Sequence, residues 1–346
     1  MNDSCRIVAF GELLLRLSPP SNLRLEQAQV FEARYGGAEA NTAISLAMQG
    51  DAAAFVSAVP PNRIGTCALR SLRAYGVDIS SVVREGQRLG IYYFEVGSSV
   101  RGNSCEYDRA WSAFSQTSHD AFDWERILDG ADAFYVSGVT PALSTELSKA
   151  CYEALACARR MGVTTICDLN YRGKLWSPEE AQRVMRGLLP FVDVCIANDE
   201  DAPSALGMDC VTGSLACGID ERMDYVEMAR RICEEFGCRK VASVVRNVNS
   251  VEESDWMGLL FDAGSGKHAF SAVHHMHVLE GVAAGDAFSA GLIHALLHGF
   301  DQQRAIDYAI AASVLKLTIH GDANVVSAQE IEVLASSAAG GLRVER

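Results

Sequence analysis

Residues 279–291 read Leu-Glu-Gly-Val-Ala-Ala-Gly-Asp-Ala-Phe-Ser-Ala-Gly, a turn of small residues that brings the carboxylate of Asp286 to the start of an apolar helical run. Small residues let backbone N–H groups converge, and the first turn of the next helix adds unpaired donors and a positive dipole end. Such a turn is typical of a phosphate site. Because a carboxylate repels phosphate unless a hydroxyl or metal ion separates them, the stretch favours phosphoryl transfer to an alcohol. An ordinary helix cap at Asp286 is the alternative.

Composition limits the class of protein. With 346 residues, 49% of them hydrophobic, the chain can bury a large core, as one α/β domain with an insertion or as two domains. The net charge of −14 disfavours nucleic acid and anionic membranes as partners. We expect a cytoplasmic protein, since the sequence shows neither a signal segment nor a membrane span. The 11 cysteines are odd in number and never spaced Cys-x-x-Cys, which indicates neither a disulfide framework nor a zinc knuckle.

Strands and helices alternate along most of the chain. The pattern predicts a parallel sheet with crossover helices, because buried apolar runs are separated by amphipathic segments. The expected strands are 5–11, 132–137, 163–169, 192–196 and 239–246, with two or three shorter ones within 256–278. The expected helices open at 36–43 and lie near 63–75, 144–161, 178–189, 199–206, 222–236, 286–298, 301–319 and 327–336.

Two extended segments interrupt this alternation. Residues 12–35 and 88–110 show short alternating runs separated by Pro-rich or Gly/Ser/Asn-rich turns. We expect them to pair into a small separate β-sheet, leaving 1–11, 36–87 and 111–346 as the core. Such a sheet could serve as a lid over a ligand or as a contact between copies of the chain, which makes a homo-oligomer the expected assembly.

Polar residues follow three of the expected strands. Val139-Thr140-Pro141, Asp168-Leu169-Asn170-Tyr171-Arg172 and Asn198-Asp199-Glu200-Asp201 all fall at carboxyl ends. Ligands of parallel sheets bind beyond those ends. We therefore expect the three stretches to meet on one rim of the binding site.

Several of these stretches resemble a known family, the PfkB (ribokinase-like) carbohydrate kinases. Residues 36–43 (Gly-Gly-Ala-Glu-Ala-Asn-Thr-Ala) resemble its N-terminal sugar-binding signature, and residues 280–291 resemble its C-terminal one. The resemblance implies a ribokinase-like three-layer α/β/α fold with a mainly parallel sheet and a small β-sheet lid. Within the family, the resemblance is strongest to 2-keto-3-deoxygluconate (2-dehydro-3-deoxy-D-gluconate) kinases. It runs through Gly11-Glu12 with 15–20, Tyr107-Asp108-Arg109, 137–144, and 168–172 with 175–180.

The resemblance implies an ATP-dependent kinase that phosphorylates the 6-hydroxyl of 2-keto-3-deoxygluconate. Asp286 would accept the proton of that hydroxyl, and backbone N–H groups of Ala283, Ala284, Gly285 and Asp286 would form an anion hole. Mg²⁺ would bridge the phosphates, with Asp201 acting on it indirectly through water. The substrate residues implied are Gly36, Gly37, Asn41, Tyr92, Arg109, Arg172, Asp286 and Asp322. The nucleotide residues implied are Asn198, Arg246, Ala283 and Gly285.

Two positions depart from the family pattern and keep alternatives open. Glu280 stands where the family usually has Asp, and Ala283 replaces the first Gly of the anion hole, where a methyl group restricts the backbone. A catalytically impaired sugar-binding relative is therefore one alternative, and a neutral-sugar kinase such as a fructokinase is another. Either Arg109 or Arg172 could instead form a surface ion pair, for Arg109 with Asp108 or with a neighbouring strand, and Asn198 with Asp201 could cap a helix.

The histidines do not suggest a metal site from sequence. His274, His275 and His277 cluster, and His294 stands four residues before His298 on an expected helix. Neither group carries the Glu and the third ligand of a zinc hydrolase, so the sequence disfavours metal ligation. A nicotinamide dehydrogenase is also disfavoured, because the turn after residue 10 lacks the further glycines of a dinucleotide fingerprint.

Overall fold

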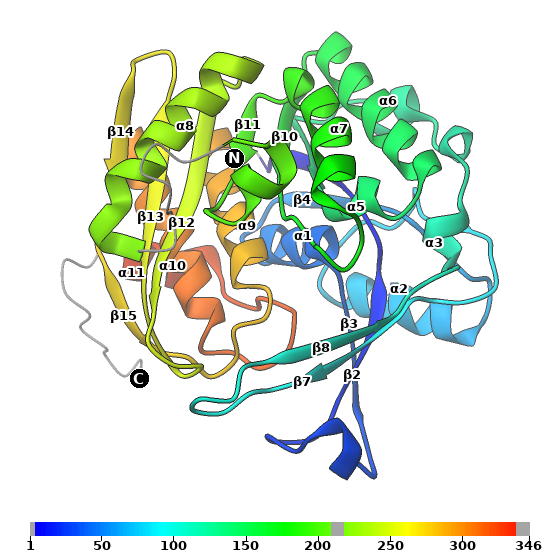
Figure 1. Cartoon of the computed structure of the whole chain (residues 1–346). Coiled ribbons are helices and arrows are strands. Elements are labelled where there is room, and N and C mark those ends of the chain that lie inside the picture. Colours follow the sequence, from blue (N-terminus) through cyan, green and yellow to red (C-terminus); the bar gives the residue numbers. More distant parts are fainter. Residues whose placement is uncertain (1–3, 209–217, 337–346) are drawn as a thin grey trace.

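The computed structural model describes residues 4–208 and 218–336 and contains a nine-stranded main sheet (Figure 1). Six strands are parallel, in the order β4 (Ala52–Val56), β1 (Arg6–Phe10), β9 (Ala133–Ser137), β10 (Thr164–Asp168), β11 (Val194–Ile196) and β12 (Lys240–Val248). β13 (Glu253–Asp262) continues the sheet antiparallel and pairs with both β14 (Lys267–Phe270) and β15 (His274–His277). The mainly parallel sheet is therefore confirmed. β4 is an addition to the expected strands, since its sequence Ala-Ala-Ala-Phe-Val has weak β-propensity.

Helices cover both faces of this sheet, which gives the expected three layers. α6 (Thr145–Met161), α7 (Pro178–Leu188) and α8 (Arg222–Phe236) pack on one face. α1 (Ala38–Met48), α2 (Arg63–Ala74), α9 (Ala284–Leu297), α10 (Gln302–Lys316) and α11 (Ala328–Ser336) pack on the other. β1 shows why the strands read as continuous apolar runs: Val8 and Phe10 join the first core, and Ile7 and Ala9 join the second.

The two interrupting segments form a separate sheet, as expected. Its order is β3 (Glu32–Gly36), β2 (Leu14–Ser18), β7 (Ile91–Glu95) and β8 (Ser104–Asp108). Two antiparallel hairpins are joined by a parallel β2–β7 pair. The sheet has a small core of its own around Leu14, Tyr92 and Phe94. Figure 1 shows it projecting from one edge of the main body, below the carboxyl ends of the parallel strands.

Local sequence accounts for most helix boundaries. Ser177 and Glu180 form a capping box at α7, which has Pro178 in its first turn, and α6 ends at the left-handed Gly162. The expected helix 199–206 is only a short π-turn, Ala202–Leu206, because the Asp201 carboxylate accepts the N–H of Asn198 and of Tyr171.

The remaining elements are short. They are the strand pair β5 (Ala58–Val59) and β6 (Val83–Arg84), the helices α3 (Ala113–Gln116), α4 (Trp124–Ile127) and α5 (Val139–Ala142), and four 3₁₀ turns at Leu25–Gln27, His119–Ala121, Leu189–Phe191 and Gly218–Glu221. No helix within the described ranges is long and apolar enough to cross a membrane.

Candidate active site

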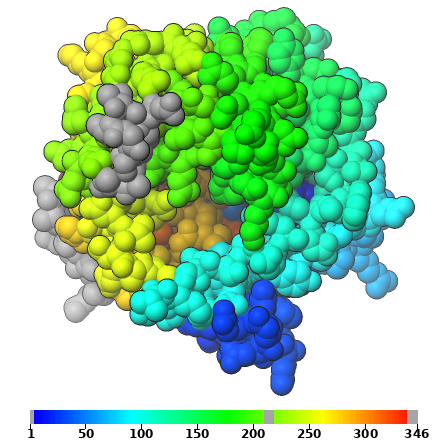
Figure 2. All heavy atoms as spheres, viewed as in Figure 1, coloured from blue at the N-terminus to red at the C-terminus, as the bar shows by residue number. Residues whose placement is uncertain are grey.

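A cavity of about 390 Å³ opens between the main sheet and the separate sheet. Figure 2 shows it as a hollow whose floor has the orange colour of the start of α9, walled by segments of β12 and β13, of the loop after β10, and of the separate sheet. The residues that sequence reasoning placed in the site meet here, although they come from stretches that lie far apart in the sequence. Those lining the cavity are Gly37, Asn41, Tyr92, Arg109, Arg172, Asn198, Asp201, Arg246, Ala283, Ala284, Gly285, Asp286 and Asp322.

Gly36 is the one predicted site residue that does not line the cavity. It lies behind Asp322: a Cβ built on Gly36 would come within 2.7 Å of Asp322 Oδ1. A Cβ on Gly37 would come within 2.0 Å of the Glu12 carbonyl oxygen. Close backbone packing therefore requires both glycines in this structure, and a contact of either with a sugar hydroxyl stays a prediction.

The turn at the floor forms with a methyl group present. Ala283 has φ 63° and ψ 11°, a left-handed conformation that Gly adopts without cost and other residues adopt at roughly 1–2 kcal/mol. α9 starts directly after it, and a Cβ at Gly281 or Gly285 would meet no atom within 4 Å. The open space beside the first-turn N–H groups of α9 suits the approach of an anion.

Asp286 stands in the first turn of α9 and points toward α1. Its Oδ2 accepts the Nδ2–H of Asn41 at 2.8 Å, and Thr42 Oγ1 donates to its backbone oxygen at 3.3 Å. Burial raises the pKa of Asp286 to about 7, against the lowering effects of the Asn41 hydrogen bond and the Arg172 charge. The N-cap residue of α9 is Ala283, with no side-chain capping bond. Asp286 is therefore held as a carboxylate that exchanges its proton near neutral pH.

A second buried carboxylate, Glu39, lies close to Asp286 and was missed by sequence reasoning. Its Oε1 accepts hydrogen bonds from Ser137 N at 2.9 Å, Ser137 Oγ at 2.7 Å and Thr140 Oγ1 at 2.9 Å. Burial raises the pKa of Glu39, and its charge contributes to the raised pKa of Asp286. A Cβ on Gly11 would overlap the Glu39 carboxylate at 2.0 Å. In the sequence, the only signals of a buried Glu39 were Gly11 after β1 and the run 137–140 (Ser-Gly-Val-Thr) at the end of β9.

The rim beyond β10 and β11 is acidic. Burial first, then the charges of Asp201 and Asp286, raise the pKa of Asp168 well above its usual value. The two oxygens of Asp201 accept the N–H of Tyr171 at 2.8 Å and of Asn198 at 3.2 Å, while Asn198 Oδ1 accepts Val244 N–H at 3.1 Å. These bonds tie the loops after β10 and β11 to each other and to strand β12. Carboxylates crowded in this way suit a hard divalent cation such as Mg²⁺, and Asp199 and Glu200 line the same rim.

The two predicted substrate arginines have different surroundings. Arg172 is exposed, donates one hydrogen bond to its neighbour's backbone at Tyr171 O (3.0 Å), and lowers the pKa of Asp286. Arg109 is only 8% exposed, and its Nε donates to Glu12 Oε2 at 2.8 Å in a buried ion pair. The alternative surface pairing with Asp108 does not form. The guanidinium of Arg88 takes that carboxylate instead, at 2.8 Å.

Arg246 lies at the far side of the cavity, on β12. It is exposed, and its guanidinium lies 5.2 Å from the ring centre of Trp256 on the adjacent strand β13. This arrangement leaves a flat cationic surface at the cavity mouth. A contact with the nucleotide remains a prediction.

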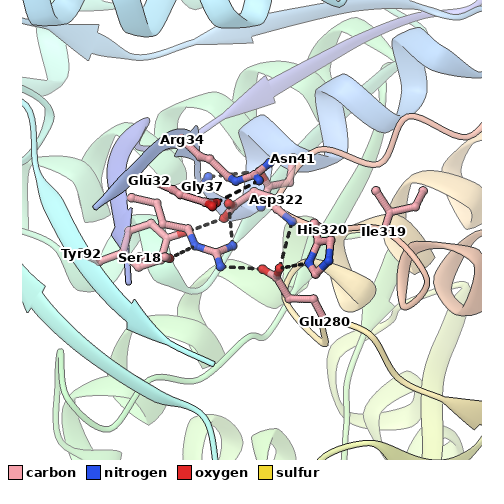
Figure 3. A network of polar contacts seen from close by, with 12 residues as sticks. Ser18, Glu32, Arg34, Gly37, Asn41, Tyr92, Glu280, Ile319, His320 and Asp322 are labelled. Atoms are coloured by element: carbon pink, nitrogen blue, oxygen red, sulfur yellow. Dashed lines mark hydrogen bonds and ion pairs between the residues drawn. The ribbon is translucent and has the colours of Figure 1, made fainter. Parts of the chain in front are cut away.

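The opposite wall carries a compact ionic network (Figure 3). Arg16, only 2% exposed, pairs with Asp322 Oδ2 at 3.0 Å and with Glu280 Oε1 at 2.5 Å. Its guanidinium also lies 4.5 Å from the ring centre of Phe94, and Tyr92 donates its hydroxyl hydrogen to Asp322. Arg16 and Tyr92 thus hold the carboxylate of Asp322 in place, and sequence reasoning did not foresee the pairing of Asp322 with Arg16.

Glu280, one of the two departures from the family pattern, belongs to this network. Besides Arg16, it accepts the N–H of Gly321 at 3.1 Å. Burial alone would raise the pKa of Glu280, but the Arg16 charge and the Gly321 hydrogen bond outweigh it and lower the pKa. Lys316 is fully buried nearby, donates to Ile319 O at 2.9 Å, and has its pKa lowered to about 8 by burial. Glu280 is therefore an ionised, paired carboxylate.

Comparison with known proteins agrees with this geometry. Residues 5–329 match the family described as "pfkB family carbohydrate kinase". A 2-dehydro-3-deoxygalactonokinase of Haloferax volcanii is 33% identical over 95% of this chain and 96% of its own. The crystal structure of a 2-dehydro-3-deoxygluconokinase from Thermotoga maritima is 42% identical, with a TM-score of 0.92, and covers 96% of this chain and 99% of that one. The crystal structure of a protein from E. coli described as ribokinase II, in complex with ATP and Mg²⁺, shares the fold at 19% identity and a TM-score of 0.73, covering 96% of this chain and 98% of that one.

Proposed function

We propose, because this chain belongs to the PfkB family of carbohydrate kinases, that it transfers the γ-phosphoryl group of ATP to the 6-hydroxyl of 2-keto-3-deoxygluconate. The observation that carries the proposal is Asp286: a carboxylate with a pKa of about 7, at the first turn of a helix, beneath a cavity that also receives Arg172. Relatives named for two sugar-acid kinases support the substrate class over a neutral sugar or a non-catalytic role.

In this proposal Asp286 accepts the proton of the attacking hydroxyl. Its pKa near 7 suits that task, because it is ionised at cellular pH yet basic enough to take a proton as the oxygen bonds to phosphorus. Asn41 fixes the orientation of the carboxylate through its 2.8 Å hydrogen bond. The transition state of phosphoryl transfer is loose, so the position of the hydroxyl matters more than its early deprotonation.

The first-turn N–H groups of α9 would receive the negative charge of the transferring phosphoryl oxygens. Those of Ala284, Gly285 and Asp286 have no carbonyl one turn earlier to bond, and the left-handed Ala283 turns the chain so that they face the cavity side of the helix. Mg²⁺, when bound, would neutralise the phosphates, and the acidic rim of Asp168, Asp199 and Glu200 would hold it directly or through water. Asp201 would hold these residues in position, because its carboxylate accepts the N–H groups of Tyr171 and Asn198.

Arg172 is proposed to bind the substrate carboxylate. Its guanidinium donates one hydrogen bond to the backbone oxygen of Tyr171, so donors stay available for a bidentate pair with a carboxylate. Arg109, whose charge is matched by Glu12, would instead shape the pocket and contribute at most a further hydrogen bond. We therefore expect binding of the sugar acid to depend on Arg172 more than on Arg109.

The test is ADP release from Mg-ATP over a matched panel. The panel holds 2-keto-3-deoxygluconate, its C4 epimer 2-keto-3-deoxygalactonate, fructose and ribose. We expect the highest kcat/KM for a 2-keto-3-deoxy sugar acid. The ratio of the kcat/KM values for the two epimers gives the preference at C4, since one relative is named for the galactonate and the other for the gluconate. A preference for fructose would refute the sugar-acid substrate, and binding without ADP release would refute catalysis.

The assembly and location remain part of the proposal. The separate sheet exposes β3, whose residues Glu32, Ala33 and Arg34 are exposed, and this edge would be the contact between two copies. Sedimentation of the intact protein tests the homo-oligomer. A cytoplasmic location, where ATP is available, stays a prediction from the sequence.

A further inference from the structure

A cluster of side chains that can bind metal lies at the other end of α9, away from the cavity. His294 and His298 stand on its last turns, Asp51 lies between α1 and β4, and Cys5 precedes β1. His294 Nδ1 is 2.7 Å from Asp51 Oδ2, and His298 Nε2 is 2.9 Å from Asp51 Oδ1. Ligand atoms of Cys5, Asp51 and His298 all lie within 4.8 Å of one another. The tertiary structure thus supplies the carboxylate and thiol that the two histidines lack in sequence.

We propose that Cys5, Asp51 and His298 bind one transition-metal ion of the zinc class. One thiolate, one carboxylate and one imidazole are ligands that zinc accepts, and three protein ligands leave a fourth position for water. Ligand atoms around tetrahedral zinc lie roughly 3.3–3.8 Å apart, given bond lengths of about 2.0–2.3 Å. The cluster therefore needs only small side-chain movements to close around an ion.

The neighbours of the cluster support a ligand rather than a simple hydrogen-bonded pair. Asp51 is buried, and its second oxygen would keep the His294 bond, which is the outer-shell contact that orients metal-bound carboxylates. The Tyr308 ring stacks on His294 with centroids 5.1 Å apart, and its hydroxyl is buried with no hydrogen-bond partner among the described residues. A buried hydroxyl without a partner, next to the histidine that holds Asp51, is consistent with a site that is completed by a further group.

Access and chemistry are also suitable. His298 is exposed, so an ion can enter from solvent, and binding would replace its hydrogen bond to Asp51 by a bond to the metal. The Cys5 thiol would lose its proton to solvent as the metal–sulfur bond forms. Mg²⁺ prefers oxygen ligands, so the Mg-ATP of a kinase would not compete for this site.

The metal would join three elements that are far apart in sequence: the start of β1, the α1–β4 loop and the end of α9. Asp286 lies 12 residues before His298 on α9, which is roughly 18 Å at 1.5 Å per residue. The ion would therefore fix the far end of the helix that carries Asp286 without touching the cavity. This inference does not depend on the proposed substrate.

The direct test is a Co²⁺ titration of tag-free, full-length protein that has been treated with a chelator and then freed of it. We expect one equivalent of Co²⁺ to bind, with a thiolate-to-cobalt charge-transfer band that Zn²⁺ removes by competition. Cys5→Ser should abolish the band. His298→Ala should weaken Co²⁺ binding by at least about 10-fold, as even outer-shell losses cost 10–100-fold. At one fixed Zn²⁺ concentration, the rise in Tm should be larger for the parent than for either variant.

Matched variants separate this site from general surface binding. Cys67→Ser removes an exposed thiol on α2, and His277→Ala removes an exposed histidine that lies 2.7 Å from Glu253. Both should leave the band and the affinity unchanged. The proposal is overturned if the parent shows no charge-transfer band, if the band survives Cys5→Ser, or if the control variants lose Co²⁺ as readily. Because His298 is exposed, its variant should fold, and the Tm without metal checks that.

Discussion

The two acidic walls of the cavity are neutralised to different degrees. On one wall, Asp322 and Glu280 share the buried guanidinium of Arg16, and the pKa of Glu280 is lowered. On the other, Asp286 and Asp168 form no ion pair among the described residues, and burial raises the pKa of both carboxyl groups. Buried carboxylates cost free energy unless they are paired. The first wall is therefore a matched ionic network, whereas the second has the raised pKa values that are typical of functional carboxylates.

Removing Arg16 should have the largest effect. Arg16→Ala leaves Asp322 and Glu280 buried without their cation, and breaking a buried ion pair costs about 3–5 kcal/mol. We expect a correspondingly large fall in the free energy of unfolding, measured with urea. Arg34→Ala breaks an exposed pair with Glu32 and should cost at most about 1 kcal/mol. Equal losses in the two variants would remove the contrast between the walls.

Neutralising Asp286 should separate activity from stability. Asp286→Asn keeps the size of the side chain but cannot accept the proton, so kcat should fall by about 10²-fold or more. The Tm at pH 8 should rise, since a desolvated charge is removed. Steady-state kinetics and calorimetry measure the two effects. Near-normal turnover in Asp286→Asn would mean that Asp286 acts only as a helix cap at the start of α9.

The pH profile tests the same carboxylate without mutation. With a pKa of about 7, Asp286 is ionised above pH 7 and loses its charge as the pH falls, so kcat/KM should drop about 10-fold per unit below pH 7. Stability should run the other way: the folded pKa lies above the unfolded value, so this contribution is complete below about pH 4 and lost as pH rises to 7. A flat kcat/KM between pH 5 and 8 would contradict the raised pKa.

Arg172 is an exposed cation whose charge lowers the pKa values of Asp286 and Asp168. Arg172→Ala should raise KM for the sugar acid by roughly 10-fold or more while KM for ATP stays nearly unchanged. Lysine at this position should rescue only in part, since a point charge cannot reproduce the guanidinium fork. Arg70→Ala, at an exposed arginine on α2, is the control and should change neither constant. An unchanged KM for the sugar acid in Arg172→Ala would contradict the proposed substrate and favour a neutral sugar.

Ala283 should give the smallest effect. Ala283→Gly relieves a left-handed backbone, but the glycine also gains entropy in the unfolded chain, so the net gain in stability should be at most about 1 kcal/mol. Turnover should change only modestly, because backbone donors do not depend on the side chain. A jump from undetectable to robust turnover would show that the natural protein is an impaired kinase.

Sequence reasoning found the floor of the cavity because its signal is local. The small-residue turn, Asp286 and the apolar helix follow one another within 13 residues, and the strand ends recur at crossover spacing. The structure brings these together as expected. β4 and the short turn after Asp201 were not foreseen, because alanines carry little strand signal and because the Asp201 carboxylate bonds two loops instead of a helix.

Sequence alone therefore determined most of the strands and helices, the separate sheet and the carboxylate at the start of α9, since periodicity and turn chemistry act between near neighbours. Only the tertiary structure decided which charges are matched. Arg16 meets Asp322 across 306 positions, and Asp51 meets His298 across 247. Arg109 and Arg172 look equivalent in sequence, yet Glu12 pairs with only the first. Such pairs form where the sheet order brings distant strand ends together, and no local pattern records which partners will meet there.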